Sequence, residues 1–431
     1  MYNLQESFDF RSIIKDPESE QSKSILYENK ISYKKVNSKY NHDQEYGIFK
    51  YDKSRLNTEE YQTLGLFRSI LVKNGKVVCF SPPKSLVWSD AIDMMDKNTE
   101  YHVEQFAEGI MINVFWDETF PEQNEKGKFL FATKSSIHGN VTFFDNGEYP
   151  IKKIGDLFAE VCEYVKLDLS ILSKKYCYSF VMQHPDYRIV QKVNEPRLTL
   201  IAVYEINNDS MQIYNIPLDT ASITKYDKDV ESGYEKTMII PGTNVSRLLS
   251  YHMNNVDYAN VYKKICDISK DITTLTPGLC VSLWNKEGEY VRTKIRDPRY
   301  EQIKQLRGNQ PKLEYHYLTL RSKNSVIEYL KYYPEHASKF HLYKEKVFHF
   351  TRSLFENYRD CYIKKTIDLE SCPYQHKTHL AILHKNYMYI LRPKGLYINF
   401  EYVKQYVNKL HEAQLMFALN YHHRPDHHTS S

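Results

Sequence analysis

The chain has 431 residues, of which 42% are hydrophobic and 26% are charged. These values are typical of folded globular proteins and exclude an intrinsically disordered chain, and the length allows two or three domains. The formal net charge of +4 is small, so any binding of nucleic acid must use a local basic patch rather than bulk charge.

The sequence carries no signal for membrane insertion or secretion. No stretch approaches the ~18 consecutive apolar residues of a membrane span, and the N-terminus lacks the basic-then-apolar pattern of a signal peptide. The seven cysteines form no C-x-x-C pair and are odd in number, which favours free, mostly buried thiols in a reducing compartment. We therefore expect a cytoplasmic location and no membrane partner.

The N-terminal part of the chain predicts a polar lead-in followed by strands. Residues 1–30 are polar and charged, and we expect them to be loosely ordered. Leu66–Lys73 and Lys76–Phe80 flank Asn74-Gly75, a two-residue hairpin signal because both positions tolerate positive φ. Glu118–Lys128 reads as a long polar loop. Further strands are predicted at Gly109–Asp117, Phe129–Ser135, Tyr178–Met182, Leu198–Ile206, Gln212–Ile216, Cys280–Trp284 and Glu289–Ile295.

Helical spacing of apolar residues occurs once among these strands, over residues 154–165, and then dominates the chain after about residue 301. It recurs from Val326, over Phe340–Tyr358, and in a final helix over residues 403–419. The fold class is therefore α+β, with a mixed domain at 31–300 and an all-helical domain at 301–421. Residues 422–431 are His-rich and could chelate a metal weakly, but we interpret them as a disordered tail.

Seven segments in chain order resemble the nucleotidyl-transfer core of phage-type ATP-dependent RNA ligases, members of the covalent nucleotidyltransferase superfamily. The continuation Arg307–Arg321 is similar to a segment of relatives from large DNA viruses. The resemblance implies a nucleotidyltransferase (ATP-grasp-like ligase) domain of antiparallel sheets with helices. The seven segments are Leu66–Leu71, Pro82–Leu86, Val103–Asp117, Phe131–Ile137, Tyr178–Val190, Pro277–Leu283 and Val291–Tyr300.

The residue that would carry the covalent chemistry of that family is missing. Where the resemblance implies K-x-D/E-G, with lysine as the nucleophile, this chain has Phe106-Ala107-Glu108-Gly109, and phenylalanine has no lone pair with which to attack phosphate. Val181 and Pro277 stand where the family has carboxylates. The resemblance therefore implies no catalytic residue and no metal ligand, which is the pattern of a pseudoenzyme.

The basic residues of the motifs are retained, together with the glutamate that normally helps to orient ATP or metal. The spacing of two between Lys294 and Arg296 places both on one face of a strand. The resemblance implies RNA as a partner and a nucleotide as a second ligand. The nucleotide- or phosphate-binding residues that it implies are Arg68, Lys84, Glu108, Lys134, Arg188, Lys294 and Arg296.

Two other functions remain open at this point. One is an active ATP-dependent RNA ligase with Lys84 or Lys134 as a non-standard nucleophile, for which ATP and Mg²⁺ would be the cofactors. The other is a structural protein of the virion or viral factory, on a ligase-derived fold. Basic and aromatic residues alternate in the C-terminal domain, as in Lys344 and Phe348; they could grip RNA, although aromatics at helical spacing more often form the buried stripe. The location expected for any of these is the host cytoplasm, a viral factory or the virion.

Overall fold

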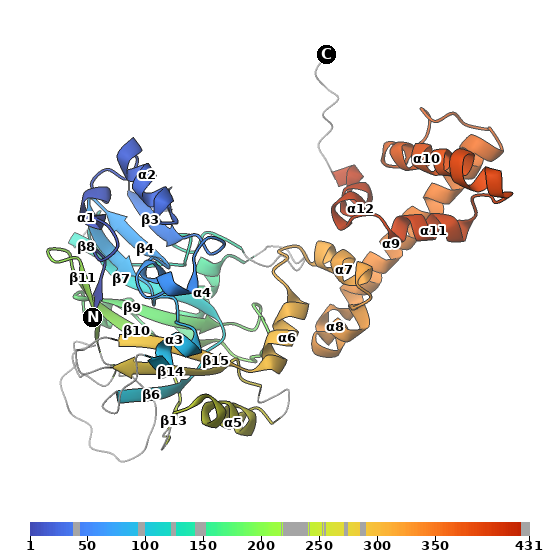
Figure 1. The fold of residues 1–431 in the computed structure, drawn as a ribbon. Coiled ribbons are helices and arrows are strands. Elements are labelled where there is room, and N and C mark those ends of the chain that lie inside the picture. Colours follow the sequence, from blue (N-terminus) through green and yellow to red (C-terminus); the bar gives the residue numbers. More distant parts are fainter. Residues whose placement is uncertain are drawn as a thin grey trace. The chain divides into compact units, whose positions relative to one another are not determined.

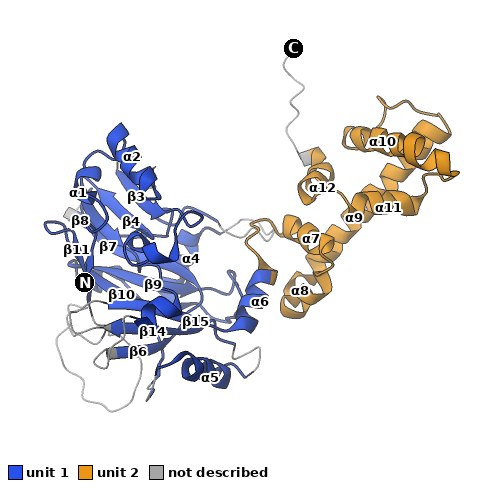
Figure 2. Cartoon of the chain, viewed as in Figure 1, with its two compact units in different colours: residues 1–143, 152–305 blue, residues 144–151, 306–431 orange. Residues whose placement is uncertain are grey.

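The computed structural model describes residues 1–37, 44–93, 100–121, 126–142, 152–216, 218, 240, 242–251, 253, 256–270, 275–284 and 290–423. The chain divides into two compact units (Figure 2). The first contains residues 1–143 and 152–305, and the second contains residues 144–151 and 306–431. The sequence predicts a boundary after residue 300, and the division in the structure falls after Gln305.

The largest sheet of the first unit has the order β1-β11-β10-β9-β7-β8, with β12 paired to β10. All its pairs are antiparallel except the short β10–β12 contact. Helix α4 (Ile154–Tyr164), at the predicted position, packs on one face. The strands are β1 (Tyr2–Asn3), β7 (Ile110–Pro121), β8 (Lys126–Ala132), β9 (Tyr176–Gln183), β10 (Arg197–Asn207), β11 (Gln212–Ile216) and β12 (Ser246–Arg247).

A four-stranded antiparallel sheet covers the other face of the large sheet, and the two share one apolar core. Its strands are β2 (Ile31–Asn37), β3 (Glu45–Tyr51), β4 (Ile70–Lys73) and β5 (Lys76–Phe80). Asn74 and Gly75 have φ of 49° and 69°, so the predicted hairpin is confirmed. The prediction of a loosely ordered lead-in is wrong, because Leu4, Phe10 and Ile13 are no more than 1% exposed in this core. The short helices α1 (Phe10–Ile13) and α2 (Glu20–Glu28) belong to the same region.

The third sheet, β13-β6-β14-β15, positions the candidate site (Figure 1). Its apolar face packs in a core with α3 (Trp88–Asp93) and α5 (Tyr258–Ile268) through residues such as Val281 and Ile295. Because side chains alternate along a strand, the residues between them face the opposite side. The strands are β13 (Ser250–Tyr251), β6 (Glu100–Gln105), β14 (Gly278–Trp284) and β15 (Tyr290–Arg296).

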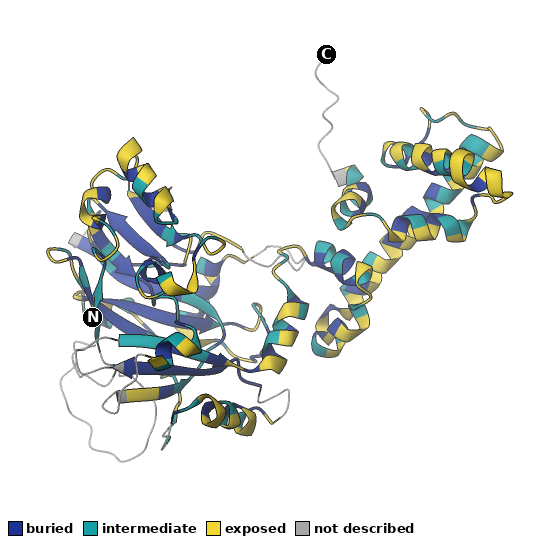
Figure 3. Ribbon diagram, in the orientation of Figure 1, coloured by how far each residue is buried: buried dark blue, intermediate teal, exposed yellow. Residues whose placement is uncertain are grey.

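The second unit contains only helices among its described residues, with a buried stripe that includes Tyr329, Phe340 and Leu354 (Figure 3). Phe350 is also buried, whereas Phe348 is 47% exposed, so the aromatics are divided between core and surface. Helix α6 (Pro298–Arg307) spans the boundary between the units. The others are α7 (Leu313–Ser322), α8 (Val326–Tyr332), α9 (Ala337–Tyr358), α10 (Tyr374–Asn386), α11 (Phe400–Asn408) and α12 (Glu412–Leu419).

The structure corrects several boundaries. The polar stretch predicted as a loop at Glu118–Lys128 instead extends β7 to Pro121 and starts β8 at Lys126. The predicted final helix is two helices, because the side chain of His411 accepts the N–H of Ala413 and starts a new one. Most of the His-rich tail lies outside the described residues. Within the described part of the chain, no helix has the length and apolarity needed to cross a membrane.

Candidate functional site

Strand β15 presents a row of positive charge on the polar face of the third sheet. Arg292, Lys294 and Arg296 alternate with Thr293 and Ile295, which are buried on the other side. In the antiparallel register, Lys294 lies opposite Cys280 of β14, and Cys280 lies opposite Glu104 of β6. Directly opposed residues share a face of the sheet, so the three strands contribute side chains to the same region.

A cavity of about 250 Å³ lies over this face. Its lining includes five cationic residues and two carboxylates, which gives the walls an excess of positive charge. Residues from five of the seven motif segments line it: Leu66–Leu71, Val103–Asp117, Tyr178–Val190, Pro277–Leu283 and Val291–Tyr300. The charged lining residues are Arg68, Arg292, Lys294, Arg296, Lys304, Glu104 and Glu108.

Phe106 forms a wall of the cavity just after β6. Its backbone N–H donates to the carbonyl of Gly278 over 3.0 Å, which extends the pairing of β6 with β14. The ammonium nitrogen of Lys294 lies 3.8 Å from the centroid of the ring, and the guanidinium carbon of Arg296 lies 5.8 Å from it. These are cation–π distances. Residue 106 thus offers an aromatic face, and the ammonium of Lys294, from β15 on the far side of β14, lies over it.

Glu108 is buried and its carboxylate is used within the protein. The backbone N–H groups of Val190 and Gln191 donate to it over 3.1–3.2 Å, and the hydroxyl of Tyr300 donates over 2.5 Å. Burial raises its pKa, and these hydrogen bonds oppose the rise. The carboxylate therefore holds the segment around residue 190 against the cavity wall. Both oxygens of Glu108 already accept hydrogen bonds from the protein itself.

The start of β7 depends on the glycine that follows Glu108. Gly109 has φ of 150°, and a Cβ there would lie 2.4 Å from the carbonyl oxygen of Met182. A side chain would collide with the backbone of β9. The glycine of the motif thus allows β7 to pair closely with β9 beside the cavity.

Arg68 enters the cavity from the segment just before β4. One of its guanidinium nitrogens lies 3.4 Å from the carbonyl oxygen of Pro82. Burial is the largest cause of the lowered pKa of Arg68, and the positive charges of Arg292 and Arg296 lower it further. An arginine remains charged despite such a shift. The mutual repulsion of these guanidinium groups would be relieved by an anion bound between them.

Lys134 and Lys84 lie outside the lining of this cavity but within electrostatic reach of it. Partial desolvation of the ammonium, then Arg68 and other cations including Lys84, lower the pKa of Lys134 to about 8, although the residue as a whole is exposed. The ammonium of Lys84 lies 3.4 Å above the ring of Tyr61. Lys84 lines a neighbouring cavity to which Arg292 also contributes.

Arg188 is the third predicted cation that does not line the cavity, after Lys84 and Lys134. Its Nε donates to the carbonyl of Val190 over 3.0 Å, within the segment that Glu108 holds. The neighbouring Ile189 is the residue of this segment that lines the cavity.

The lining residues do not fit a magnesium site. Mg²⁺ requires oxygen ligands, mostly carboxylates, with octahedral geometry. Val181 and Pro277 are part of the lining and supply no side-chain oxygen. Among the described residues, Glu104 and Glu108 are the carboxylates there, and Glu108 is occupied as described. Burial raises the pKa of Glu104, which disfavours its charged form.

Contributors to the cavity that were not predicted from the sequence include Arg292, Lys304, Glu104 and Tyr300. Arg292 could have been found, because it precedes Lys294 by two residues and must share its face of the strand. Tyr300 ends the motif that contains Lys294. Glu104 carries no local signal; its place follows from the pairing of β6 with β14.

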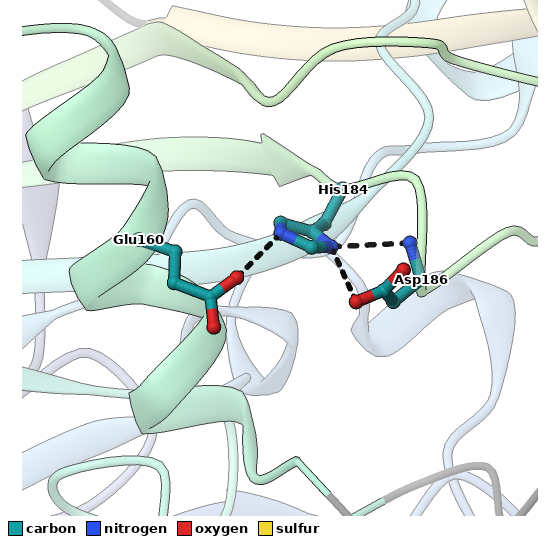
Figure 4. Close-up of side chains that lie close together, drawn as sticks. All are labelled: Glu160, His184 and Asp186. Carbon is teal, nitrogen blue, oxygen red and sulfur yellow. Dashed lines mark hydrogen bonds and ion pairs between the residues drawn. The ribbon is translucent and has the colours of Figure 1, made fainter. Parts of the chain in front are cut away.

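Away from the cavity, Glu160, His184 and Asp186 place potential metal-ligand atoms within 4.8 Å of one another (Figure 4). His184 Nε2 lies 3.1 Å from the carboxylate of Glu160. The ammonium of Lys152 lies 2.9 Å from Glu160 and 3.0 Å from Asp186. The charge of the carboxylates is thus already compensated by a lysine, and the cluster is an ion-pair network.

No family model and no curated protein matches this chain. Among solved structures, it is similar to two structures described as form 2 and form 1 of an archaeal ATP-dependent RNA ligase. The first has 12% identity and a TM-score of 0.40 over 74% of this chain and 70% of that one. The second has 9% identity and a TM-score of 0.35 over 69% of this chain and 64% of that one. At these values the likeness adds no argument about function.

Proposed function

We propose that this chain is an RNA-ligase-like pseudoenzyme that binds the phosphate of a nucleotide or of an RNA end in the cavity over β15. The observation that carries this proposal is the convergence of Arg68, Arg292, Lys294 and Arg296 on one cavity, next to an aromatic residue at position 106. Planar guanidinium groups match phosphate oxygens in pairs. Phe106 offers a surface for stacking and no nucleophile.

The charge balance of the cavity supports an anionic ligand. Five cations face two carboxylates, and Glu108 is held by three donors from the protein itself. A guanidinium nitrogen of Arg296 forms an ion pair with a carboxylate oxygen of Glu301 at 2.6 Å, and the ammonium nitrogen of Lys304 lies 3.7 Å from the same oxygen. Among the described residues, no salt bridge joins Arg68 or Arg292 to a carboxylate; Arg68 lies near the carbonyl of Pro82 and Arg292 near that of Pro83. They are the groups that a phosphate would neutralise.

The test is equilibrium binding of a short fluorescent RNA with a 5′-phosphate, compared with the same RNA ending in a 5′-hydroxyl, with ATP as a competitor. The expected result is tighter binding of the phosphorylated RNA. Arg68→Gln should abolish the preference, and the matched control Lys23→Gln, which alters an exposed lysine paired with Glu20 on α2, should retain it. Equal affinity for both RNAs would contradict the proposal and favour a structural protein of the virion or viral factory.

A further inference from the structure

The C-terminal end of α10 exposes apolar side chains in the second unit. Residues 385–397, which we call the α10 tip, contain the end of α10, a π-helical turn and a 3₁₀ turn. Tyr389 and Tyr397 are 76% and 72% exposed, and Leu396 is 52% exposed. The two turns span Tyr387–Leu391 and Arg392–Lys394. The exposed large apolar side chains of the tip are Met388, Tyr389, Ile390, Leu396 and Tyr397.

The backbone of the α10 tip is held by hydrogen bonds. Gly395 has φ of 70°, and its N–H donates to the carbonyl of Arg392 over 3.0 Å. The N–H of Leu396 donates to the carbonyl of Leu391, also over 3.0 Å. This pair of bonds around a left-handed glycine is the Schellman motif, in which the residue after the glycine often packs on the preceding turn. Leu396 is instead half exposed, so a hydrogen-bonded backbone presents it to the surroundings.

The sequence around the α10 tip has an excess of positive charge. No aspartate or glutamate occurs at 371–400, whereas four lysines and arginines do. The carboxylates that flank this stretch are Glu370 and Glu401, and they are paired with Lys377 and Lys404 at 2.9 Å and 3.2 Å. The flanking negative charge is therefore already compensated by other lysines.

Three cations of the α10 tip form no ion pair with any described carboxylate: Lys385, Arg392 and Lys394. A guanidinium nitrogen of Arg392 lies 3.8 Å from the sulfur of Met388. Positive charge and exposed apolar side chains thus lie together on the same short segment. Exposed apolar patches of this kind mark surfaces that bind a partner.

We propose that the α10 tip is a docking surface for an anionic membrane, with Tyr389, Leu396 and Tyr397 entering the boundary between lipid headgroups and acyl chains. The cations of the tip would lie at the level of the lipid phosphates. Tyrosine suits this boundary because its ring is apolar and its hydroxyl can stay hydrated. The sequence predicts no membrane partner because it contains no spanning segment, and contact with a membrane surface does not require one.

The aliphatic side chains of the tip favour lipid over RNA as the partner. Bases stack on aromatic rings and on arginine, and Met388, Ile390 and Leu396 offer neither. A protein partner would need a carboxylate at a fixed position for each of the three cations. The headgroups of an anionic leaflet form a continuous negative surface and require no such match.

The test is flotation of the full chain with vesicles of phosphatidylcholine, prepared with and without phosphatidylserine. The expected result is binding to the vesicles that contain phosphatidylserine and little binding to the others. The double variant Arg392→Gln/Lys394→Gln should lower the affinity by about 30-fold, because each basic residue near an anionic surface contributes about fivefold. Leu396→Ser should weaken binding as well. The matched controls Leu342→Ser and Lys344→Gln, which alter exposed residues of α9, should bind like the parent chain.

A second readout is hydrogen exchange, in which the amides of residues 385–397 should be slowed by vesicles that contain phosphatidylserine. Absence of flotation with these vesicles would overturn the inference and point to a protein partner. Flotation of Leu396→Ser and of the double variant like the parent would also overturn it. Loss of affinity for RNA in these variants, without loss of flotation, would assign the surface to RNA instead. Arg68→Gln alters the cavity over β15 and should float like the parent, so failure of this inference leaves the proposed function intact.

Discussion

Removal of the Glu108 carboxylate should loosen the cavity wall from inside the protein. In Glu108→Ala, the N–H groups of Val190 and Gln191 and the hydroxyl of Tyr300 lose their acceptor. A buried donor without a partner costs about 1–3 kcal/mol, so three donors give roughly 3–6 kcal/mol if water satisfies some of the loss. Tyr300→Phe removes one donor and leaves the other two bonds intact, so its cost should be about 1 kcal/mol.

The assay is urea unfolding of both variants together with hydrogen exchange of the two amides. Glu108→Ala should lower the free energy of unfolding several times more than Tyr300→Phe does, and protection of the Val190 and Gln191 amides should fall only in the first variant. The reasoning is refuted if the two variants lose similar stability, or if the amides of Glu108→Ala exchange as slowly as those of the parent chain.

Three further predictions concern charge and backbone. Lys73→Met should lower the free energy of unfolding by about 3–5 kcal/mol, because it leaves the carboxylate of Asp117 buried without its ion-pair partner; the two side chains are 4% and 2% exposed. Urea unfolding measures this, with Lys23→Met as a control that should change stability little. Equal losses of stability in the two variants would contradict the prediction. Gly278→Ala should lower the free energy of unfolding by on the order of 1–3 kcal/mol, because its φ is 136° and a Cβ would lie 2.1 Å from the carbonyl oxygen of Ile295. Gly75 also has positive φ but has open space around it, so Gly75→Ala reports the effect of φ without the collision. A similar loss of stability in both variants on urea unfolding would argue against the collision. Lys294→Met should be at least as stable as the parent at neutral pH, because burial lowers the pKa of Lys294 and charging the amine therefore opposes folding. The free energy of unfolding of the parent should rise relative to that of the variant as pH increases from the folded pKa toward the unfolded value of about 10.4. A stability difference that stays constant across this pH range would refute the lowered pKa.

The sequence predicts the alternating strands well because their periodicity is local. The spacing of Lys294 and Arg296, and the turn at Asn74-Gly75, need no knowledge of the rest of the chain. The N-terminal 30 residues were misjudged because their composition is polar, while Leu4 and Phe10 are single apolar residues whose partners lie on distant strands. No element was predicted over strands β2 and β3.

The candidate site also combines features that the sequence predicts with features that depend on how the strands are placed. Motif order predicts one pocket with Phe106 at its floor and six cations around it: Arg68, Lys84, Lys134, Arg188, Lys294 and Arg296. The cavity is lined by Arg68, Phe106, Lys294 and Arg296, and Lys84, Lys134 and Arg188 lie outside its lining. The contacts of Glu108 could not be predicted, because its donors come from residues 190, 191 and 300, and their meeting depends on how β7, β9 and α6 are placed. The cation–π contact of Lys294 with Phe106 likewise exists only when β6 and β15 flank β14 in one sheet.

The dependence of RNA binding on salt tests most directly whether the cavity cations take up phosphate charge. For single-stranded nucleic acid, each neutralised phosphate contributes a slope of about −0.7 to the plot of log affinity against log salt concentration. With the 5′-phosphorylated RNA, the parent chain should show a negative slope, and Arg68→Gln should reduce its magnitude by about 0.7. An affinity that is independent of salt, or a slope that Arg68→Gln leaves unchanged, would contradict a phosphate site over β15.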